Sequence, residues 1–263
     1  MDSTKKFKLV LLLGQSNALG QSTVRSNLSG DYANYGDPLP GVRIAQQLVC
    51  NSDSGAAACA YEWPLMEMKG RANSVGEFGP EIGIARSIPN IESHAADKHT
   101  VIVKCASGAT DLANDWAEDA VSGYILYSRM KDFVEHTAQA WASSYEVVGC
   151  IWVQGEADAA IEAEANAYEA NLNSFIAQLR TDFSNATMPF IISRLHASNV
   201  ATYAATVRAA QDAVAAADSN VTVVTPTPSL SGDNVHYDEN GYAELGETDL
   251  GPALDAKFSL CGG

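Results

Sequence analysis

Apolar, β-branched runs recur along the chain and alternate with stretches of helical spacing. The runs lie at residues 8–13, 100–105, 147–153, 189–193 and 221–225. Between them, residues 124–143, 161–183 and 200–217 carry apolar side chains three and four positions apart, which predicts amphipathic helices. Strands that alternate with helices imply right-handed crossovers and parallel strands that are buried on both faces. The pattern therefore predicts an α/β fold, a three-layer, doubly wound and mostly parallel sheet.

The remaining segments complete one unit. The chain has 263 residues, of which 46% are apolar. This composition favours one domain that spans residues 1–263 rather than two small domains. Residues 21–79 are the least regular part, rich in Gly, Ser, Asn and Pro, with a further strand expected at 42–49. A loop region this long in a compact domain is usually functional, so we expect it to wall one side of a site. A helix over residues 240–258 is expected to close the fold.

Charge excludes several classes of partner. The chain has 16 Lys and Arg against 32 Asp and Glu, a formal net charge of −16. Such a field repels phosphate backbones and anionic membrane surfaces, so neither nucleic acid nor a membrane is expected as a partner. Only Leu9–Leu13 separate the N-terminal lysines from Gly14, too short for a secretory signal, and no apolar stretch approaches the roughly 20 residues that span a bilayer. The compartment and the oligomeric state stay open.

The five cysteines do not form a metal-binding pattern. Cys105 and Cys150 lie in strand-like apolar runs, where a thiol usually behaves as a small buried hydrophobic group. Cys50 and Cys59 flank a loop rich in Ser, Gly and Ala, and two alternatives remain: a short disulfide in an oxidising compartment, or two free thiols. No Cys-x-x-Cys pair or His/Cys ligand spacing occurs, so no structural zinc is expected. The six-residue spacing from Gly14 to Gly20 does not match the dinucleotide fingerprint, and no cofactor is expected.

Two segments at opposite ends of the chain carry candidate chemistry. Ser16 follows the first strand on a tight turn, and Asp233 precedes His236 by three residues on a late loop. A serine capping a helix is common, and a lone loop histidine is usually a bystander. The Asp-x-x-His spacing favours chemistry, because the carboxylate can reach the imidazole nitrogen that faces away from a serine. Ligands of doubly wound sheets bind at the carboxyl ends of the strands, where Ser16, Ser107-Gly108, Gln154 and the Asp233 loop all fall.

Four ordered blocks carry a family resemblance. They are GQSN at 14–17, KCASGAT at 104–110, WVQGEAD at 152–158 and DNVH at 233–236. With these blocks the chain resembles the SGNH hydrolases, which have a flavodoxin-like fold, and within them the carbohydrate esterases of family six and the sialate O-acetylesterase-like proteins. The resemblance spans nearly the whole chain.

The resemblance implies a role for each matching residue. Ser16 would be the nucleophile, His236 the base and Asp233 its orienting carboxylate. The oxyanion hole would comprise the backbone N–H groups of Ser16 and Gly108 and the side-chain amide of Gln154. The supporting residues would be Gln15, Asn17 and Glu156. Glu156 and Asp158 could form a general acid/base pair of carboxylates, but their spacing does not place them on one face. This favours a structural role for Glu156, in which it supports the Gln154 loop or an arginine.

Three positions depart from the family pattern. Ala18 replaces a frequent methionine, Val153 replaces a frequent histidine, and Ala109 occupies the second position of a usual Gly-Gly pair. The last departure puts the geometry of the oxyanion loop in question.

The implied function is a serine esterase that removes O-acetyl groups from carbohydrate, either acetylated polysaccharide or sialic acid, through an acetyl-enzyme and without a metal. Two alternatives remain: a general short-chain carboxylesterase or thioesterase, and a catalytically silent glycan-binding module. Trp63, Trp116 and Tyr237 are candidates for a sugar-stacking rim, with core packing as the alternative.

Overall fold

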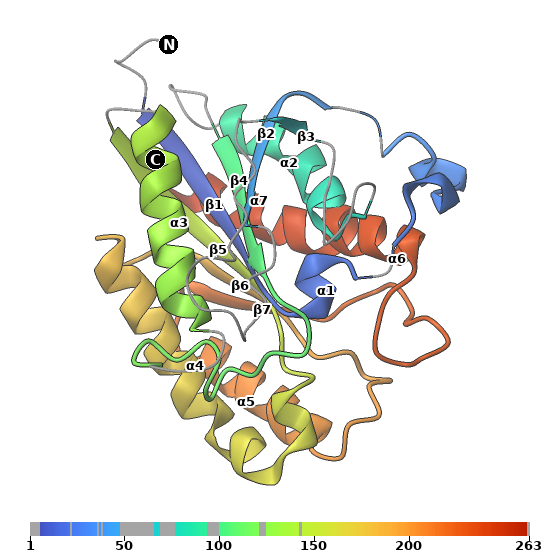
Figure 1. Cartoon of the computed structure of the whole chain (residues 1–263), viewed down its shortest axis with the longest axis vertical. Coiled ribbons are helices and arrows are strands. Elements are labelled where there is room, and N and C mark those ends of the chain that lie inside the picture. The colour runs from blue at the N-terminus through green and yellow to red at the C-terminus, as the bar shows by residue number, and fades with distance from the viewer. Residues whose placement is uncertain are drawn as a thin grey trace.

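The computed structural model describes residues 6–21, 23–35, 37, 39–47, 66–68, 77–93, 100–120, 125–141 and 144–261. Within these residues the chain forms one seven-stranded sheet between two layers of helices (Figure 1). The strands are β1 (Lys6–Gly14), β2 (Leu39–Gln47), β3 (Met66–Met68), β4 (Thr100–Ala106), β5 (Ser144–Val153), β6 (Phe190–Ser193) and β7 (Val221–Val224).

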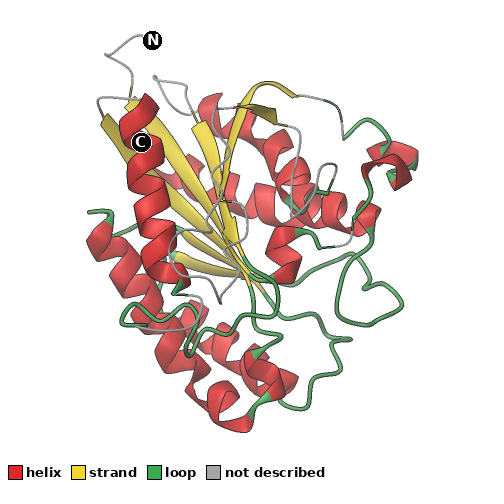
Figure 2. Cartoon of the chain, in the orientation of Figure 1, coloured by secondary structure: helices red, strands yellow, loops and turns green. Residues whose placement is uncertain are grey.

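The sheet is doubly wound, as predicted. Its strand order is β3-β2-β4-β1-β5-β6-β7, and every neighbouring pair is parallel except β2 and β3. Strand β1 lies between β4 and β5, so the chain winds outward from β1 in both directions. Doubly wound sheets bind ligands where the winding reverses, outside the carboxyl ends of the strands. The loops after β1, β4 and β5 meet at that edge (Figure 2).

Helices cover both faces of the sheet. They are α1 (Ser16–Leu19), α2 (Glu81–Ser93), α3 (Leu126–Trp141), α4 (Glu162–Asp182), α5 (Ala204–Ala217), α6 (Glu239–Glu244) and α7 (Gly251–Cys261), with a π-helical segment, Leu245–Leu250, joining the last two. Helices α3, α4 and α5 lie on one face, and α1, α2, α6 and α7 on the other (Figure 1).

Alternation along β1 divides the core into two halves. Leu9, Leu11 and Leu13 pack toward α3 and α4, while Val10 and Leu12 pack toward α2 and α7. All five are at most 1% exposed. Burying one such side chain stabilises the fold by about 1.5–3 kcal/mol, so residues 9–13 of this strand are all apolar rather than alternating with polar residues.

The predicted elements agree with the structure in type and differ at their ends. The expected strand at 42–49 is β2, and the expected helix at 240–258 is the α6, π-helical and α7 series. Neither the four-residue α1 nor the three-residue β3 was predicted, because such short elements show no periodicity. Cys105 and Cys150 are buried free thiols, while Cys50 and Cys59 lie outside the described residues. Among the described helices, none combines the length and the apolarity needed to cross a membrane.

Candidate active site

Ser16 is held at the carboxyl end of β1 by a turn that needs glycine. Gly14 has φ of +140°, and a Cβ there would lie 2.0 Å from the carbonyl oxygen of Val153. That approach lets the N–H of Gln15 donate to the same carbonyl at 3.1 Å. Ser16 then begins α1, and the residue is 3% exposed. The close contact between β1 and β5 therefore sets the position of the serine hydroxyl.

The loop at 231–236 is organised around the carboxylate of Asp233. Its Oδ1 accepts hydrogen bonds from the backbone N–H groups of Val235 and His236, both at 2.9 Å, and from the Ser231 hydroxyl at 3.0 Å. Asn234, at φ of +57°, makes the tight turn, a conformation that asparagine tolerates better than most residues. One oxygen of Asp233 thus holds the loop, which leaves the other oxygen for the imidazole.

His236 connects the two segments. Its Nδ1 lies 2.7 Å from Asp233 Oδ2, and its Nε2 lies 3.0 Å from the Oγ of Ser16. With Nδ1 donating to the carboxylate, Nε2 carries the lone pair that can accept the serine proton. Burial would raise the pKa of Asp233, but the hydrogen bonds from His236 and Val235 outweigh it and hold that pKa well below its usual range. The carboxylate is thus ionised at every pH at which histidine can act as a base.

Asn17 joins the turn at Ser16 to the loop at 231–236. Its side-chain Nδ2 donates to Glu156 Oε1 at 2.6 Å and to the carbonyl of Val235 at 2.9 Å, and its Oδ1 accepts from the Tyr242 hydroxyl at 2.9 Å. Glu156 therefore supports Asn17 rather than the Gln154 loop or an arginine. Burial raises the pKa of Glu156, and the bond from Asn17 opposes that rise.

Gln15 supports the site from the other side. Its Oε1 accepts from the N–H of Ala157 at 3.3 Å, which links the turn at Ser16 to the loop after β5.

Two backbone N–H groups, those of Ser16 and Gly108, lie in neighbouring loops at the carboxyl ends of β1 and β4. A Cβ on Gly108 would lie 3.9 Å from the Cβ of Ser16, so the loop after β4 runs directly beside this serine. Within the described residues, neither the N–H of Ser16 nor that of Gly108 donates to another protein group. Ala109 has φ of +57°, which is the conformation a glycine would adopt without strain. The loop thus keeps a left-handed turn where the family pattern has a second glycine.

Gln154 departs from its expected role. Its side-chain Nε2 donates to the carbonyl of Thr110 at 3.1 Å and to Asp158 Oδ2 at 2.6 Å, and its Oε1 accepts from the Tyr168 hydroxyl at 2.9 Å. Both amide hydrogens are therefore used inside the protein, and neither is left for an oxyanion in this arrangement. The sequence indicates Asp158 only as part of a block and, beside Glu156, as one of a carboxylate pair, and it does not predict the contact with Gln154.

The candidate sugar-stacking residues are mostly core residues. Trp116 is 1% exposed and Tyr237 5% exposed, so neither presents a ring face to a ligand, and Trp63 lies outside the described residues. Trp116 packs edge-on against Trp152, with ring centroids 5.2 Å apart. Core packing, the alternative interpretation, is correct for Trp116 and Tyr237.

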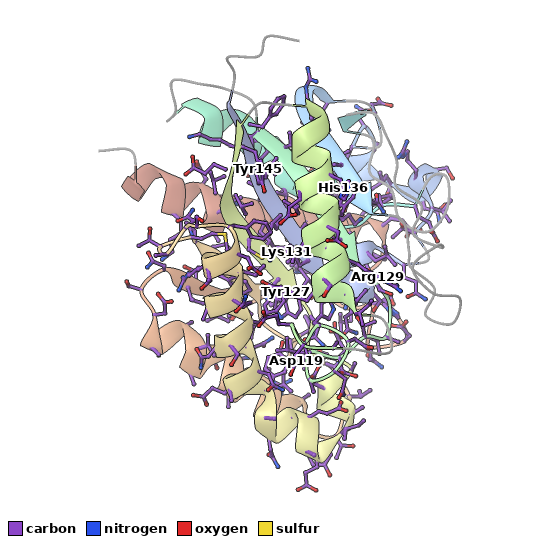
Figure 3. All side chains as sticks on the ribbon, turned by 60° about the vertical axis from the view of Figure 1, so that its left-hand side comes forward. Asp119, Tyr127, Arg129, Lys131, His136 and Tyr145 are labelled. Atoms are coloured by element: carbon purple, nitrogen blue, oxygen red, sulfur yellow. The ribbon has the colours of Figure 1, made fainter. Side chains whose placement is uncertain are left out.

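A cavity of about 310 Å³ lies near Trp116, between the loop after β4 and α4. Its wall includes Tyr127, Phe175 and the carboxylates of Glu118 and Asp119, but not Ser16, Gly108 or His236. Figure 3 shows Asp119 and Tyr127 near the end of α3 that faces this loop. The cavity is thus separate from the serine and histidine.

One group of described side chains has a spacing that could hold a metal ion. Carboxylate oxygens of Asp111, Asp158 and Glu164 lie within 4.8 Å of one another. Asp158 already accepts hydrogen bonds from Leu112 and Gln154, and acidic groups commonly gather without an ion. We assign no metal to them.

The chain is similar to known proteins in sequence and in structure. A model of the family described as carbohydrate esterase, sialic acid-specific acetylesterase, matches residues 6–251. A probable carbohydrate esterase of Arabidopsis thaliana is 29% identical over 170 residues, which are 64% of this chain and 60% of that protein. The chain thus aligns with less than two thirds of that relative.

Solved structures share the fold at lower identity. A protein from Arabidopsis thaliana superposes with a TM-score of 0.70 at 23% identity, covering 95% of this chain and 98% of that one. NanS superposes with a TM-score of 0.63 at 12% identity, covering 99% of each chain. A carbohydrate acetylesterase from Xanthomonas citri gives a TM-score of 0.59 at 15% identity, covering 94% of this chain and 55% of that one.

Proposed function

Because the chain belongs to the carbohydrate esterase, sialic acid-specific acetylesterase family, we propose that it is a single-domain serine esterase that removes O-acetyl groups from carbohydrate. The observation that carries the proposal is the His236 imidazole, which lies 2.7 Å from the Asp233 carboxylate and 3.0 Å from the Ser16 hydroxyl. A nucleophile, a base and a group that orients the base are the parts that covalent acyl transfer requires.

In the proposed first step, the Oγ of Ser16 attacks the acetyl carbonyl carbon while Nε2 of His236 takes the hydroxyl proton. The carbonyl π electrons move onto oxygen, and this oxyanion lies against the N–H groups of Ser16 and Gly108. When the oxyanion collapses, the ester C–O bond breaks and His236 returns the proton to the sugar oxygen. Water then repeats the sequence on the acetyl-enzyme, which releases acetate and restores the serine.

We further propose that the oxyanion hole consists of these two backbone donors, with Gln154 holding their loop. A main-chain donor adds no net charge and needs no reorganisation as the oxyanion forms. In the arrangement described above, the amide of Gln154 stabilises Thr110 two residues beyond Gly108. Gln154→Ala should then lower kcat by displacing the loop, with little change in KM.

Acetate release from a panel of acetylated glycans tests the proposal. The panel should include acetylated xylan and O-acetylated sialic acid, with Ser16→Ala as the inactive control. Release that disappears in a folded Ser16→Ala protein supports the serine esterase. An intact fold with no release from any ester, in the wild type, would leave the glycan-binding alternative.

Acyl-chain selectivity separates the acetylesterase from a general esterase. We expect the acetyl ester of a chromogenic alcohol to be cleaved with higher kcat/KM than the butyryl ester. Each added methylene must find apolar area worth about 0.8 kcal/mol or clash with the wall of the site. Equal or better cleavage of longer esters, measured below micelle-forming concentrations, would favour the short-chain carboxylesterase or thioesterase.

A further inference from the structure

Asp158 is a buried carboxylate that joins the loop after β4 to the loop after β5. The residue is 0% exposed and begins the short 3₁₀ turn Asp158–Ala160. Its Oδ1 and Oδ2 accept from the backbone N–H of Leu112 at 3.2 and 2.9 Å, and its Oδ2 also accepts from Gln154 Nε2 at 2.6 Å. A buried carboxylate is costly unless such donors surround it, so these contacts constrain both loops.

The same contacts hold Thr110, whose hydroxyl donates to the carbonyl of Ser107 at 2.8 Å, and that carbonyl belongs to the same peptide group as the N–H of Gly108. Gln154, held by Asp158, donates to the carbonyl of Thr110, and Asp158 itself holds the N–H of Leu112. Ala109 lies between Gly108 and the two residues that these hydrogen bonds hold, Thr110 and Leu112. Its φ of +57° costs an L-residue roughly 1–2 kcal/mol. A strained residue keeps its conformation only where its surroundings hold it there. Releasing these contacts would let Ala109 relax and would displace Thr110, whose hydroxyl holds the peptide group that carries the N–H of Gly108.

We infer that Asp158 is a positioning residue for the oxyanion loop, with the Gln154 side chain as its link to Thr110. Asp158 acts through the backbone and does not contact the substrate. The inference rests on the proposed esterase function and adds to it a residue outside the triad whose carboxylate supports the transition state.

Neighbouring acidic groups do not share these contacts. Glu164 faces Asp158 from α4 and Asp111 faces it from the loop, and each has a carboxylate oxygen within 4.8 Å of the others. Asp111 accepts from the N–H groups of Asn114 and Asp115, and Glu164 accepts from the Asn114 side chain at 3.5 Å. Neither holds Thr110 or Leu112. Glu164→Gln is therefore a matched control, since it removes a nearby charge and leaves the ties to the loop intact.

The test is Asp158→Asn in the full-length protein. The NH₂ group cannot accept from the N–H of Leu112, and the remaining amide oxygen is neutral and a weaker acceptor than a carboxylate, so the hydrogen bonds from Leu112 and Gln154 are both weakened. Losing one oxyanion donor typically lowers kcat by about 10²–10³-fold, and a displaced donor should lower it by about 10–100-fold. We expect KM for a chromogenic acetyl ester to stay within about twofold, because the ground-state carbonyl gains little from this donor.

A tetrahedral boronate adduct gives a readout that a merely structural role would not change. An aryl boronic acid bonds to the serine oxygen and places a boron-bound oxygen where the oxyanion would lie. Its Ki, measured on protein whose folded fraction is known from near-UV circular dichroism, should rise in proportion to the loss of kcat. Glu164→Gln should leave both kcat and Ki within about twofold of the wild type.

Three results would overturn the inference: unchanged kcat per folded Asp158→Asn molecule, a change confined to KM, or an equal loss in Glu164→Gln. If Asp158→Asn does not fold, Asp158→Glu keeps the charge, displaces the carboxylate by one methylene and is judged by the same measurements. A wild-type protein that hydrolyses no acetyl ester would defeat the proposed function instead, and that outcome appears before any variant is made.

Discussion

The Nε2 of His236 lies 3.0 Å from the Oγ of Ser16, although the two residues are 220 positions apart in the chain. Asn17 stabilises this contact, because its side-chain amide donates to the Val235 carbonyl in the loop at 231–236 while its backbone belongs to helix α1, which begins at Ser16. The relationship is thus built into the packing of two loops at the edge of the sheet.

The carboxylate of Asp233 is expected to be needed for turnover. Asp233→Asn leaves the His236 tautomer or orientation wrong, and in the best-studied triad the corresponding change lowers kcat about 10⁴-fold. The measurement is kcat for an acetyl ester at pH 7 and 8. Asp238→Asn is the matched control: Asp238 caps α6 by accepting from the N–H of Gly241 at 2.7 Å, five residues along the chain from Asp233. A loss below about tenfold in Asp233→Asn would remove Asp233 from the triad.

Ala109→Gly should stabilise the protein. The left-handed conformation costs alanine roughly 1–2 kcal/mol, and glycine removes this cost. Glycine also makes the unfolded chain more flexible, which lowers the free energy of unfolding by about 0.4–1 kcal/mol. The net gain of about 0.5–1 kcal/mol corresponds to a rise in Tm of about 1–4 °C. Ala113→Gly, in the same loop but without a positive φ, should lower Tm. A fall in Tm for Ala109→Gly would show that the loop is not strained there.

Lys104 and Glu81 form a buried ion pair, and we expect their contributions to the free energy of unfolding to depend on each other. Both side chains are 0% exposed; Lys104 Nζ donates to Glu81 at 2.7 Å and to the carbonyl of Leu19, at the end of α1, at 2.7 Å. Lys104→Met leaves the carboxylate buried without its cation and should lower the free energy of unfolding by about 3–5 kcal/mol. Urea unfolding measures this.

The double variant Lys104→Met/Glu81→Gln completes the mutant cycle for that pair. It removes both charges, so it should recover part of the stability that Lys104→Met loses. Strictly additive effects of the two single changes would mean that the pair contributes no coupling energy.

Stability should depend on pH through Asp158. Burial raises the pKa of Asp158 to about 7, with the Gln154 and Leu112 hydrogen bonds opposing and the charges of Asp111 and Glu164 adding to the rise. The unfolded carboxyl titrates near roughly 3.9, so between about pH 4 and 7 the folded protein binds more protons than the unfolded chain. The contribution of this group to stability therefore falls as pH rises through that window.

Asp158→Asn removes this titration and keeps the other acidic groups. The wild-type free energy of unfolding, relative to that of Asp158→Asn, should thus decrease from pH 5 to pH 8 in urea titrations. A difference that stays constant, or that increases with pH, would contradict the raised pKa.

The long periodic elements could be predicted from the sequence, because hydrophobic burial alone determines their pattern. Helix α4 and strand β4 fall where the spacing placed them. The proximity of Ser16, Asp233 and His236 could be predicted as well, since Asp233 and His236 share one local loop and Ser16 follows a strand whose end must lie at the ligand-binding edge.

Contacts between side chains of distant segments could not be predicted. The sequence places Gln154 at the correct edge, but which way its amide turns depends on Asp158 and Thr110, and no periodicity encodes that choice. The burial of Trp116 and Tyr237 is likewise a tertiary property, because an aromatic residue suits a core and a sugar platform equally well in composition. Ala109 shows the same limit: its place in a usual Gly-Gly pair questions the loop geometry, but only the structure shows that it keeps the left-handed turn of a glycine.

Trapping the acyl-enzyme tests the central claim most directly. The protein is mixed with a chromogenic acetyl ester, quenched in acid during turnover, digested and analysed by mass spectrometry. Our account predicts a burst of the alcohol product of up to about one equivalent and one acetyl group on the peptide that contains Ser16, both absent from a folded Ser16→Ala protein. Sustained hydrolysis by Ser16→Ala, or an acetyl group carried by another residue whose replacement abolishes turnover, would contradict it.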